Sequence, residues 1–193
     1  SPTWFWISDI NGNIVSYASE EYVTKAHNTY GLSIWAMVND YSGDDGSTGD
    51  ILMDTVKRQT LINGIVEQAL TYGLEGINID FETITWEQAP AYLQFLRELT
   101  IAAHAGGLIV SVDNYVPTYT KQYKRAEQNK IVDYVVIMGY DEHTGASEEI
   151  GSVASAGFVE EGIIDTIAEV DPQKTVIAVP FYTRGWTEYY GKT

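Results

Sequence analysis

Short hydrophobic runs alternate with amphipathic stretches along this chain, and the alternation predicts its secondary structure. Runs rich in β-branched and aromatic residues predict strands at 3–8, 32–39, 76–82, 108–112, 134–138 and 175–180. Between them, apolar residues three or four positions apart predict helices at 19–30, 61–72, 87–105, 119–129 and 158–170. Strands that alternate with helices pair in parallel, because a parallel connection needs a crossover of about helix length.

The run at 76–82 differs from an ordinary buried strand because every second residue in it is polar. Successive side chains of a strand point to opposite faces. The apolar face is formed by Ile77, Ile79 and Phe81, and the polar face by Asn78, Asp80 and Glu82. The carboxylates of Asp80 and Glu82 should lie about 6.6 Å apart along the strand. Both faces of a parallel sheet are normally covered, so we expect these acids to lie away from bulk water.

Three explanations of Asp80 and Glu82 fit the residues alone. They could be ordinary loop or capping residues, and the segment 83–87 with Thr85 does look like the start of a helix. Their oxygen atoms, with that of Asn78, could also bind Ca²⁺ or Mg²⁺. A catalytic site is favoured, because an unpaired buried carboxylate costs several kcal/mol and is kept mainly where chemistry uses it.

Polar and aromatic side chains also follow the other strands. The residues at the strand exits are Asn39-Asp40, Asp80 to Glu82, Asp113-Asn114, Tyr140-Asp141 and Tyr182 to Arg184. A doubly wound sheet brings together only the exits at its switch point, whereas a TIM (β/α)8 barrel gathers all of them on one face. The glycine-rich phosphate loops of nucleotide-binding folds are missing. We therefore expect a TIM barrel, incomplete because six strands are visible instead of eight.

Composition narrows the class of ligand. The 193 residues carry a net charge of −16, with 27 acidic and 11 basic side chains, which argues against nucleic acid or an anionic membrane as a partner. Cysteine is absent, no apolar run reaches the length of a membrane span, and no cofactor motif is present. The 14 tyrosines and 5 tryptophans suit a sugar ligand, because their rings stack on sugars and keep a polar handle.

Several segments resemble glycoside hydrolase family 18, the chitinase-like TIM barrels. The segment EGINIDFE at 75–82 resembles the DGxDxDxE signature of that family, with Glu75 and Asn78 in place of acids. Residues 138–141 resemble its strand-six motif, 180–184 its strand-seven segment and 3–6 its strand two. Segment 157–163 is similar to the bacterial spore-cortex and cell-wall branch. The resemblance implies that 1–193 is a single catalytic domain, a fragment that lacks the first and last barrel strands.

The resemblance also implies a role for each matching residue. Glu82 matches the general acid, Asp80 the residue that orients the substrate acetamido group, and Tyr140 the hydroxyl that donates to the acetamido oxygen. Asp141 matches a second orienting carboxylate, and Asn78 would hold Asp80 by a hydrogen bond. The other expected substrate-binding residues, at neighbouring strand exits, are Asn39, Tyr182 and Arg184. No metal and no cofactor are implied.

The implied activity is cleavage of β-1,4 linkages after N-acetylglucosamine in peptidoglycan or chitin. The implied mechanism is retaining and substrate-assisted, so the substrate's own acetamido oxygen attacks the anomeric carbon. A non-catalytic carbohydrate-binding barrel and an inactive fragment remain alternatives. The branch implies an extracellular, cell-wall or spore-associated protein of a bacterium.

The missing strands carry an expectation about association. Without them, the strands at 3–8 and 175–180 should have open edges, with unpaired N–H and C=O groups beside Trp4, Phe5, Trp6 and residues 176–179. We therefore expect the isolated chain to self-associate through these edges, or to be part of a longer chain.

Overall fold

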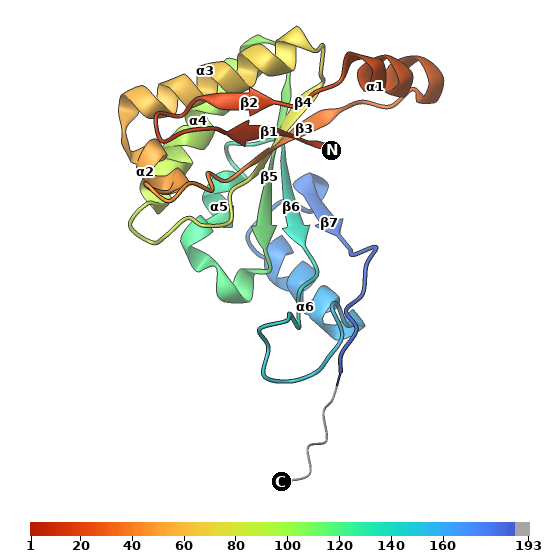
Figure 1. Cartoon of the computed structure of the whole chain (residues 1–193). Coiled ribbons are helices and arrows are strands. Elements are labelled where there is room, and N and C mark those ends of the chain that lie inside the picture. Colours follow the sequence, from red (N-terminus) through yellow and green to blue (C-terminus); the bar gives the residue numbers. More distant parts are fainter. Residues whose placement is uncertain (188–193) are drawn as a thin grey trace.

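The computed structural model describes residues 1–187. A seven-stranded sheet organises this part of the chain, in the order β2-β1-β3-β4-β5-β6-β7 (Figure 1). The strands are β1 (Thr3–Ile7), β2 (Ile14–Ser16), β3 (Trp35–Asn39), β4 (Gly76–Asp80), β5 (Ile109–Tyr115), β6 (Tyr134–Met138) and β7 (Thr175–Ala178). All neighbours pair in parallel except β1 and β2, which form an antiparallel hairpin. The predicted incomplete TIM barrel is confirmed as a fold class, and within the described residues its sheet does not close.

Helices connect the parallel strands. They are α1 (Glu20–Lys25), the π-helical turn η1 (Ala26–Tyr30), α2 (Thr48–Met53), α3 (Thr55–Thr71), α4 (Ala89–Ala105), α5 (Arg125–Gln128) and α6 (Ala156–Ile167). Short 3₁₀ turns are η2 (Pro117–Tyr119), η3 (Lys121–Tyr123) and η4 (Pro172–Lys174). None of the helices in residues 1–187 is long and apolar enough to cross a membrane.

Two predicted helices differ most from the observed ones. Helix α3 starts six residues before the predicted 61–72, because the Asp54 side chain caps it by accepting from the backbone N–H of Val56 and Lys57. The predicted helix at 119–129 is wrong. Two 3₁₀ turns and the four-residue α5 replace it, and Lys124 between them has a positive φ of 50°, which a continuous helix cannot contain.

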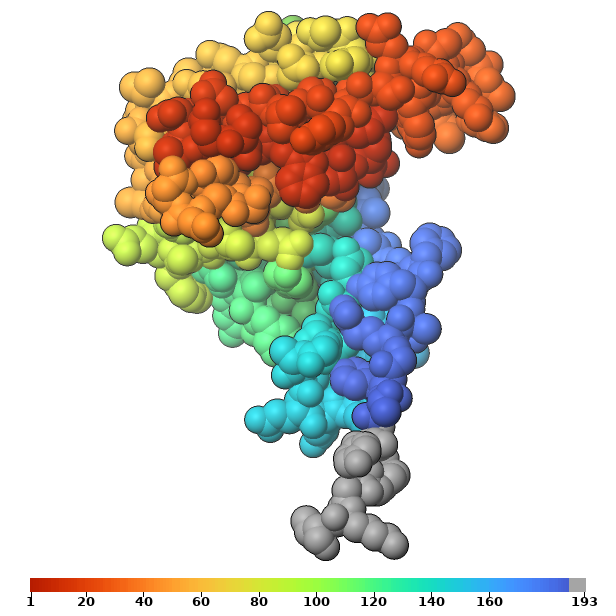
Figure 2. All heavy atoms as spheres, viewed as in Figure 1, coloured from red at the N-terminus to blue at the C-terminus, as the bar shows by residue number. Residues whose placement is uncertain are grey.

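The apolar face of β4 packs on the covering helices, as its alternation predicts. Ile77, Ile79 and Phe81 are fully buried, and Phe81 stacks on Phe95 of α4 with ring centroids 5.5 Å apart. Figure 1 shows α3 and α4 side by side on this face of the sheet, with α6 beside β6 and β7. In Figure 2 the part from β6 onward tapers away from the broader N-terminal body. The opposite face of β4, with its polar residues, is left for the interior of the barrel.

The predicted open edge at Trp4 to Trp6 is wrong, because β2 covers it. Phe5 pairs with Ser16 and Trp6 with Val15, across a turn at 9–13. Asp9 builds this turn by accepting from Asn13 at 2.8 Å and from the Asn11 backbone N–H at 2.9 Å. A three-residue strand gives too little alternation to be recognised in sequence. Among the described residues β7 pairs only with β6, so its outer edge remains unpaired.

Candidate active site

The carboxyl end of β4 carries the two acids singled out in the sequence, and a neighbouring strand fixes their geometry. The strand ends at Asp80, two residues earlier than predicted. Beyond it, the backbone N–H groups of Glu82 and Thr83 donate to the Asp40 carboxylate, at 2.6 and 3.1 Å. Asp40 follows β3, and its carboxylate accepts the backbone N–H groups that would otherwise pair with a neighbouring strand. Asp40 is therefore a site residue to which the sequence assigned no role.

Glu82 stands at the mouth of the site among other acids. Its side chain is exposed, so the expectation that both acids lie away from water is wrong for this residue. Partial removal of the carboxyl from water, followed by the negative charges of Asp80, Asp40 and further acids, raises the pKa of Glu82 to about 7. Burial and the charge of Asp40 also raise the pKa of Asp80, which a hydrogen bond with Glu82 opposes. Glu82 is thus a carboxyl group that is still about half protonated at neutral pH.

Strand β5 supplies a second line of polar residues beside that of β4. In register, Asn78 lies beside Ser111, and its amide donates to the Ser111 hydroxyl at 2.9 Å and to the Asp113 carboxyl at 2.8 Å. The Tyr115 hydroxyl donates to the Glu82 carboxylate. The expectation that Asn78 holds Asp80 is therefore wrong, since both of its amide hydrogens serve β5. The sequence placed Asp113 at a strand exit without a role and gave Tyr115 none, although Ser111, Asp113 and Tyr115 alternate with other residues as the polar residues of β4 do.

The exits of β6 and β7 bring together four residues named from the sequence. Tyr182 donates its hydroxyl to Asp141 at 2.8 Å, and the Arg184 guanidinium donates to the same carboxylate oxygen. The Tyr140 and Tyr182 rings meet edge to face, 6.1 Å apart. Burial and the nearby acids, Asp113 first, raise the pKa of Tyr140 to about 12, so its phenol stays protonated and can donate. Asp141 has a φ of 62°, a strained conformation that its two partners hold in place.

Three buried oxygen atoms at the ends of β3 and β4 have no hydrogen-bond partner among the described residues. They are Oδ1 of Asn39, Oδ1 of Asp40 and Oδ1 of Asp80. Asn39 and Asp80 are register neighbours, so two of these atoms belong to adjacent positions. Buried polar groups without partners are rare in proteins and often mark the place of a ligand. Asn39 thus lies directly beside Asp80 at the exits of two paired strands.

A cavity of about 310 Å³ lies on the interior face of the sheet. Asn78, Asp113 and Tyr140 provide polar groups to it, and Trp35 and Met138 belong to its mostly apolar lining. A small number of polar groups in an apolar pocket is the usual composition of a site for a small organic ligand. Within residues 1–187 no three His, Asp or Glu side chains are grouped so as to hold a metal ion.

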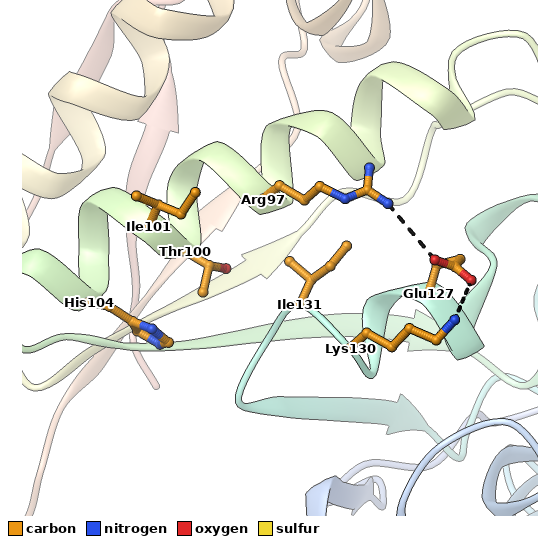
Figure 3. Close-up of a pocket in the computed structure, with 7 residues that line it drawn as sticks. All are labelled: Arg97, Thr100, Ile101, His104, Glu127, Lys130 and Ile131. Atoms are coloured by element: carbon orange, nitrogen blue, oxygen red, sulfur yellow. Dashed lines mark hydrogen bonds and ion pairs between the residues drawn. The ribbon is translucent and has the colours of Figure 1, made fainter.

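A larger hollow of about 440 Å³ lies on the outside of the molecule, between α4 and the segment around α5 (Figure 3). Its cations are already paired. Glu127 binds Lys130 at 2.7 Å and lies 3.9 Å from Arg97. None of the strand-exit residues lines it, so the interior cavity is the better candidate for the site of chemistry.

Comparison with known proteins agrees with this geometry. The sequence profile of the glycosyl hydrolases family 18 matches residues 23–192. The chain belongs to this family. Among relatives, the cortical fragment-lytic enzyme of Bacillus subtilis is 31% identical over 192 residues, covering 93% of this chain and 44% of that protein. The crystal structure of the putative sporulation-specific glycosylase YdhD from Bacillus subtilis superposes with a TM-score of 0.83 at 27% identity, covering 93% of this chain and 61% of that one.

A more distant member of the fold is a chitinase from Chromobacterium violaceum, with a TM-score of 0.80 at 20% identity, covering 92% of this chain and 59% of that one. At that identity the likeness concerns the fold. The chain spans 56%, 33% and 44% of the lengths of three of the curated relatives that it matches.

Two buried side chains behind this family 18 site fix the Glu82 turn and the end of β5. The Tyr123 hydroxyl donates to the Phe81 carbonyl at 2.7 Å and accepts from the Ile84 N–H at 3.2 Å, which fixes the Glu82 turn from both sides. Arg125 is fully buried and donates to the carbonyls of Tyr115, at 2.7 Å, and Thr120. Burial lowers the pKa of Arg125 to about 10, so it remains charged at neutral pH.

We expect the substitution Arg125→Met to lower the free energy of unfolding by about 2–4 kcal/mol, because it leaves two buried carbonyls without donors. Urea unfolding followed by circular dichroism measures the loss. The matched control is Arg97→Met, the same change at a half-exposed arginine whose ion partner is 3.9 Å away, which should cost under about 0.5 kcal/mol. Equal losses for the two variants would contradict the anchoring role of Arg125.

Proposed function

We propose that the protein containing this chain is a glycosidase that cleaves β-1,4 linkages after N-acetylglucosamine. The observation that carries the proposal is Glu82, a carboxyl with its pKa raised to about 7, placed beside Asp80 at the exit of the same strand. A group that donates a proton to a leaving oxygen near neutral pH needs such a pKa. Glu82 is therefore assigned as the general acid.

The mechanism proposed is retaining and substrate-assisted. The acetamido oxygen of the substrate attacks the anomeric carbon while Glu82 protonates the leaving oxygen, and the carbon–oxygen bond of the linkage breaks. The positively charged oxazolinium that results is stabilised by the Asp80 carboxylate. Tyr140 donates its phenol hydrogen to the acetamido oxygen and so holds it in line. Water then opens the oxazolinium, with Glu82 taking up the proton.

The remaining candidates are assigned to substrate binding. Asn39 offers a buried oxygen without a partner, next to Asp80. Asp141, oriented by Tyr182 and Arg184, offers its second carboxylate oxygen to sugar hydroxyls. Asn78 keeps a structural part in the cavity wall through its bonds to β5.

The substrate class proposed is peptidoglycan of the spore cortex or cell wall, with chitin as the alternative. The choice rests on the relatives, which include cortical fragment-lytic enzymes of Bacillus subtilis, Bacillus anthracis and Bacillus cereus. It implies action outside the cell membrane of a bacterium, at the wall or spore. We also infer that 1–193 forms part of one catalytic domain, whose barrel is completed where β7 lacks an outer partner. An isolated chain would self-associate through that edge.

Mass spectrometry of the sugars released by the full-length protein tests this function. Purified cortex peptidoglycan and chitin oligomers are incubated separately, and fragments that end in reducing N-acetylglucosamine are expected from at least one of them. Release from peptidoglycan alone would assign the cell-wall substrate. Binding of both glycans without any fragment would instead identify a non-catalytic sugar-binding barrel.

A further inference from the structure

The proposed mechanism leaves one buried acid of the site unused. Asp113 of β5 is only 7% exposed, although carboxylates are seldom buried without a cationic partner. Its Oδ1 atom accepts the Asn78 amide hydrogen at 2.8 Å, and Asn78 is held in turn by Ser111. The side chain therefore has a fixed orientation in the wall of the interior cavity. A buried carboxyl group held in the wall of a cavity calls for a functional explanation.

The groups that face Asp113 are nearly all acidic. Asp80 and Glu82 lie on the β4 side, and the Tyr140 phenol lies on the β6 side and lines the same cavity. Ionising Asp113 therefore places a second negative charge beside Asp80 in a poorly hydrated place, which is unfavourable.

Asp113 and Asp80 differ in how strongly they hold a proton. Burial raises the pKa of Asp113 to about 7, helped by the charge of Asp80 and opposed by the Asn78 hydrogen bond. Burial and the charge of Asp40 also raise the pKa of Asp80, but its side chain is only half-buried, whereas that of Asp113 is buried. When two coupled carboxyls share a site, the first proton taken up belongs to the pair and resides mainly on the more basic member. Asp113 is that member, so Asp80 carries the charge.

We propose that Asp113 is a positioning residue for catalysis, an uncharged acid fixed by Asn78 that leaves Asp80 as the charged carboxylate of a cross-strand pair. The benefit is specific to the proposed reaction. The oxazolinium needs one negative charge beside it, at Asp80, and the general acid needs its proton. When Asp113 does ionise, its charge adds to those that hold the proton on Glu82. The proposal rests on the proposed glycosidase function for its kinetic consequences alone.

The variant Asp113→Asn tests this role, because the amide oxygen can still accept from Asn78 while the ionisable group is gone. In the parent, Asp113 begins to ionise as pH approaches about 7, and its charge then helps to keep the proton on Glu82. The variant lacks this charge, so the pKa of Glu82 should fall. We expect the high-pH limb of kcat/KM on an N-acetylglucosamine oligomer to move down by about 0.5–1 pH unit. The matched control is Ser111→Ala, which also removes a partner of Asn78 but no charge and should leave the limb in place.

Two measurements do not depend on activity. Carbon-13 NMR of the carboxyl groups should give an apparent pKa near 7 for Asp113, and a lower one for Glu82 in the variant. A carboxyl whose folded pKa lies above its unfolded value adds stability at low pH, and this is lost as pH rises through the folded pKa. The unfolding midpoint of Asp113→Asn relative to the parent should therefore rise between pH 4 and pH 8.

The outcomes separate the two proposals. If no glycan is cleaved but the NMR and stability shifts appear, the proposed function fails and the acid pair stands. If glycans are cleaved but the pH limb does not move, and Asp113 titrates near 4, the acid pair is overturned. A variant that is less stable at every pH, by the same amount, would mean that Asp113 only supports the packing of the cavity wall.

Discussion

Replacing Glu82 by glutamine is expected to abolish glycan cleavage, with a loss on the order of 10²–10⁴-fold or more in kcat, while sugar binding stays largely intact. Glutamine has nearly the same shape and keeps an acceptor for the Tyr115 hydroxyl, but it has no proton to give to the leaving oxygen. Turnover on a chitin oligomer and binding by calorimetry measure the two effects. The control is Glu87→Gln, the same change at an exposed glutamate five residues on.

The pH dependence of the parent follows from the same residue. Because the pKa of Glu82 lies at about 7, above its ordinary value, the carboxyl is protonated below pH 7 and competent as an acid there. Cleavage should fall as pH rises through about 7.

A variant Glu82→Gln that retains activity within a few-fold of the parent would remove this residue from the mechanism.

The second large effect is expected at Asp80. The substitution Asp80→Asn should lower kcat about 10²-fold or more while changing KM only a few-fold, because the carboxylate is needed most when positive charge develops on the oxazolinium. Steady-state kinetics separates the two parameters. A thiazoline analogue of the intermediate should inhibit the parent and bind the variant much more weakly. Failure of the analogue to inhibit the parent at any usable concentration would contradict a substrate-assisted reaction.

Much of the fold could be predicted because local patterns and tertiary structure agree. The alternation in β4 predicted which residues face the helices, and Ile77, Ile79 and Phe81 are indeed fully buried there. The helical stretch predicted at 19–30 does end there, at Gly31 with a left-handed φ of 62°. Such signals depend on a few neighbouring residues, which a sequence displays directly.

The parts that could not be predicted depend on contacts between distant segments. Strand β5 was predicted to end at Val112 because the next residues are polar, yet it continues to Tyr115. The pairing with β4 compensates for those polar side chains, since Asn78 bonds to Asp113 and Tyr115 bonds to Glu82. A partner 33 to 35 positions away leaves no trace in a local pattern.

The loop after β5 gives a second example. Tyr123 and Arg125 look like ordinary polar positions of a helix, and the segment 119–129 was predicted as a helix. In the structure Tyr123 and Arg125 point inward and bind backbone carbonyls of other segments, and this requires the turn at Lys124 instead of a helix. Tertiary hydrogen bonds of buried donors outweigh a weak helical pattern here.

The stereochemistry and the N-acetyl requirement of cleavage test the central claim most directly. Proton NMR during the first turnovers of a chitin oligomer, compared with an oligomer whose glucosamine at the cleaved position lacks the acetyl group, shows both at once. The account predicts that the β-anomer forms first from the acetylated oligomer and that the unacetylated one is not cleaved. First formation of the α-anomer, or equal cleavage of the two oligomers, would contradict it.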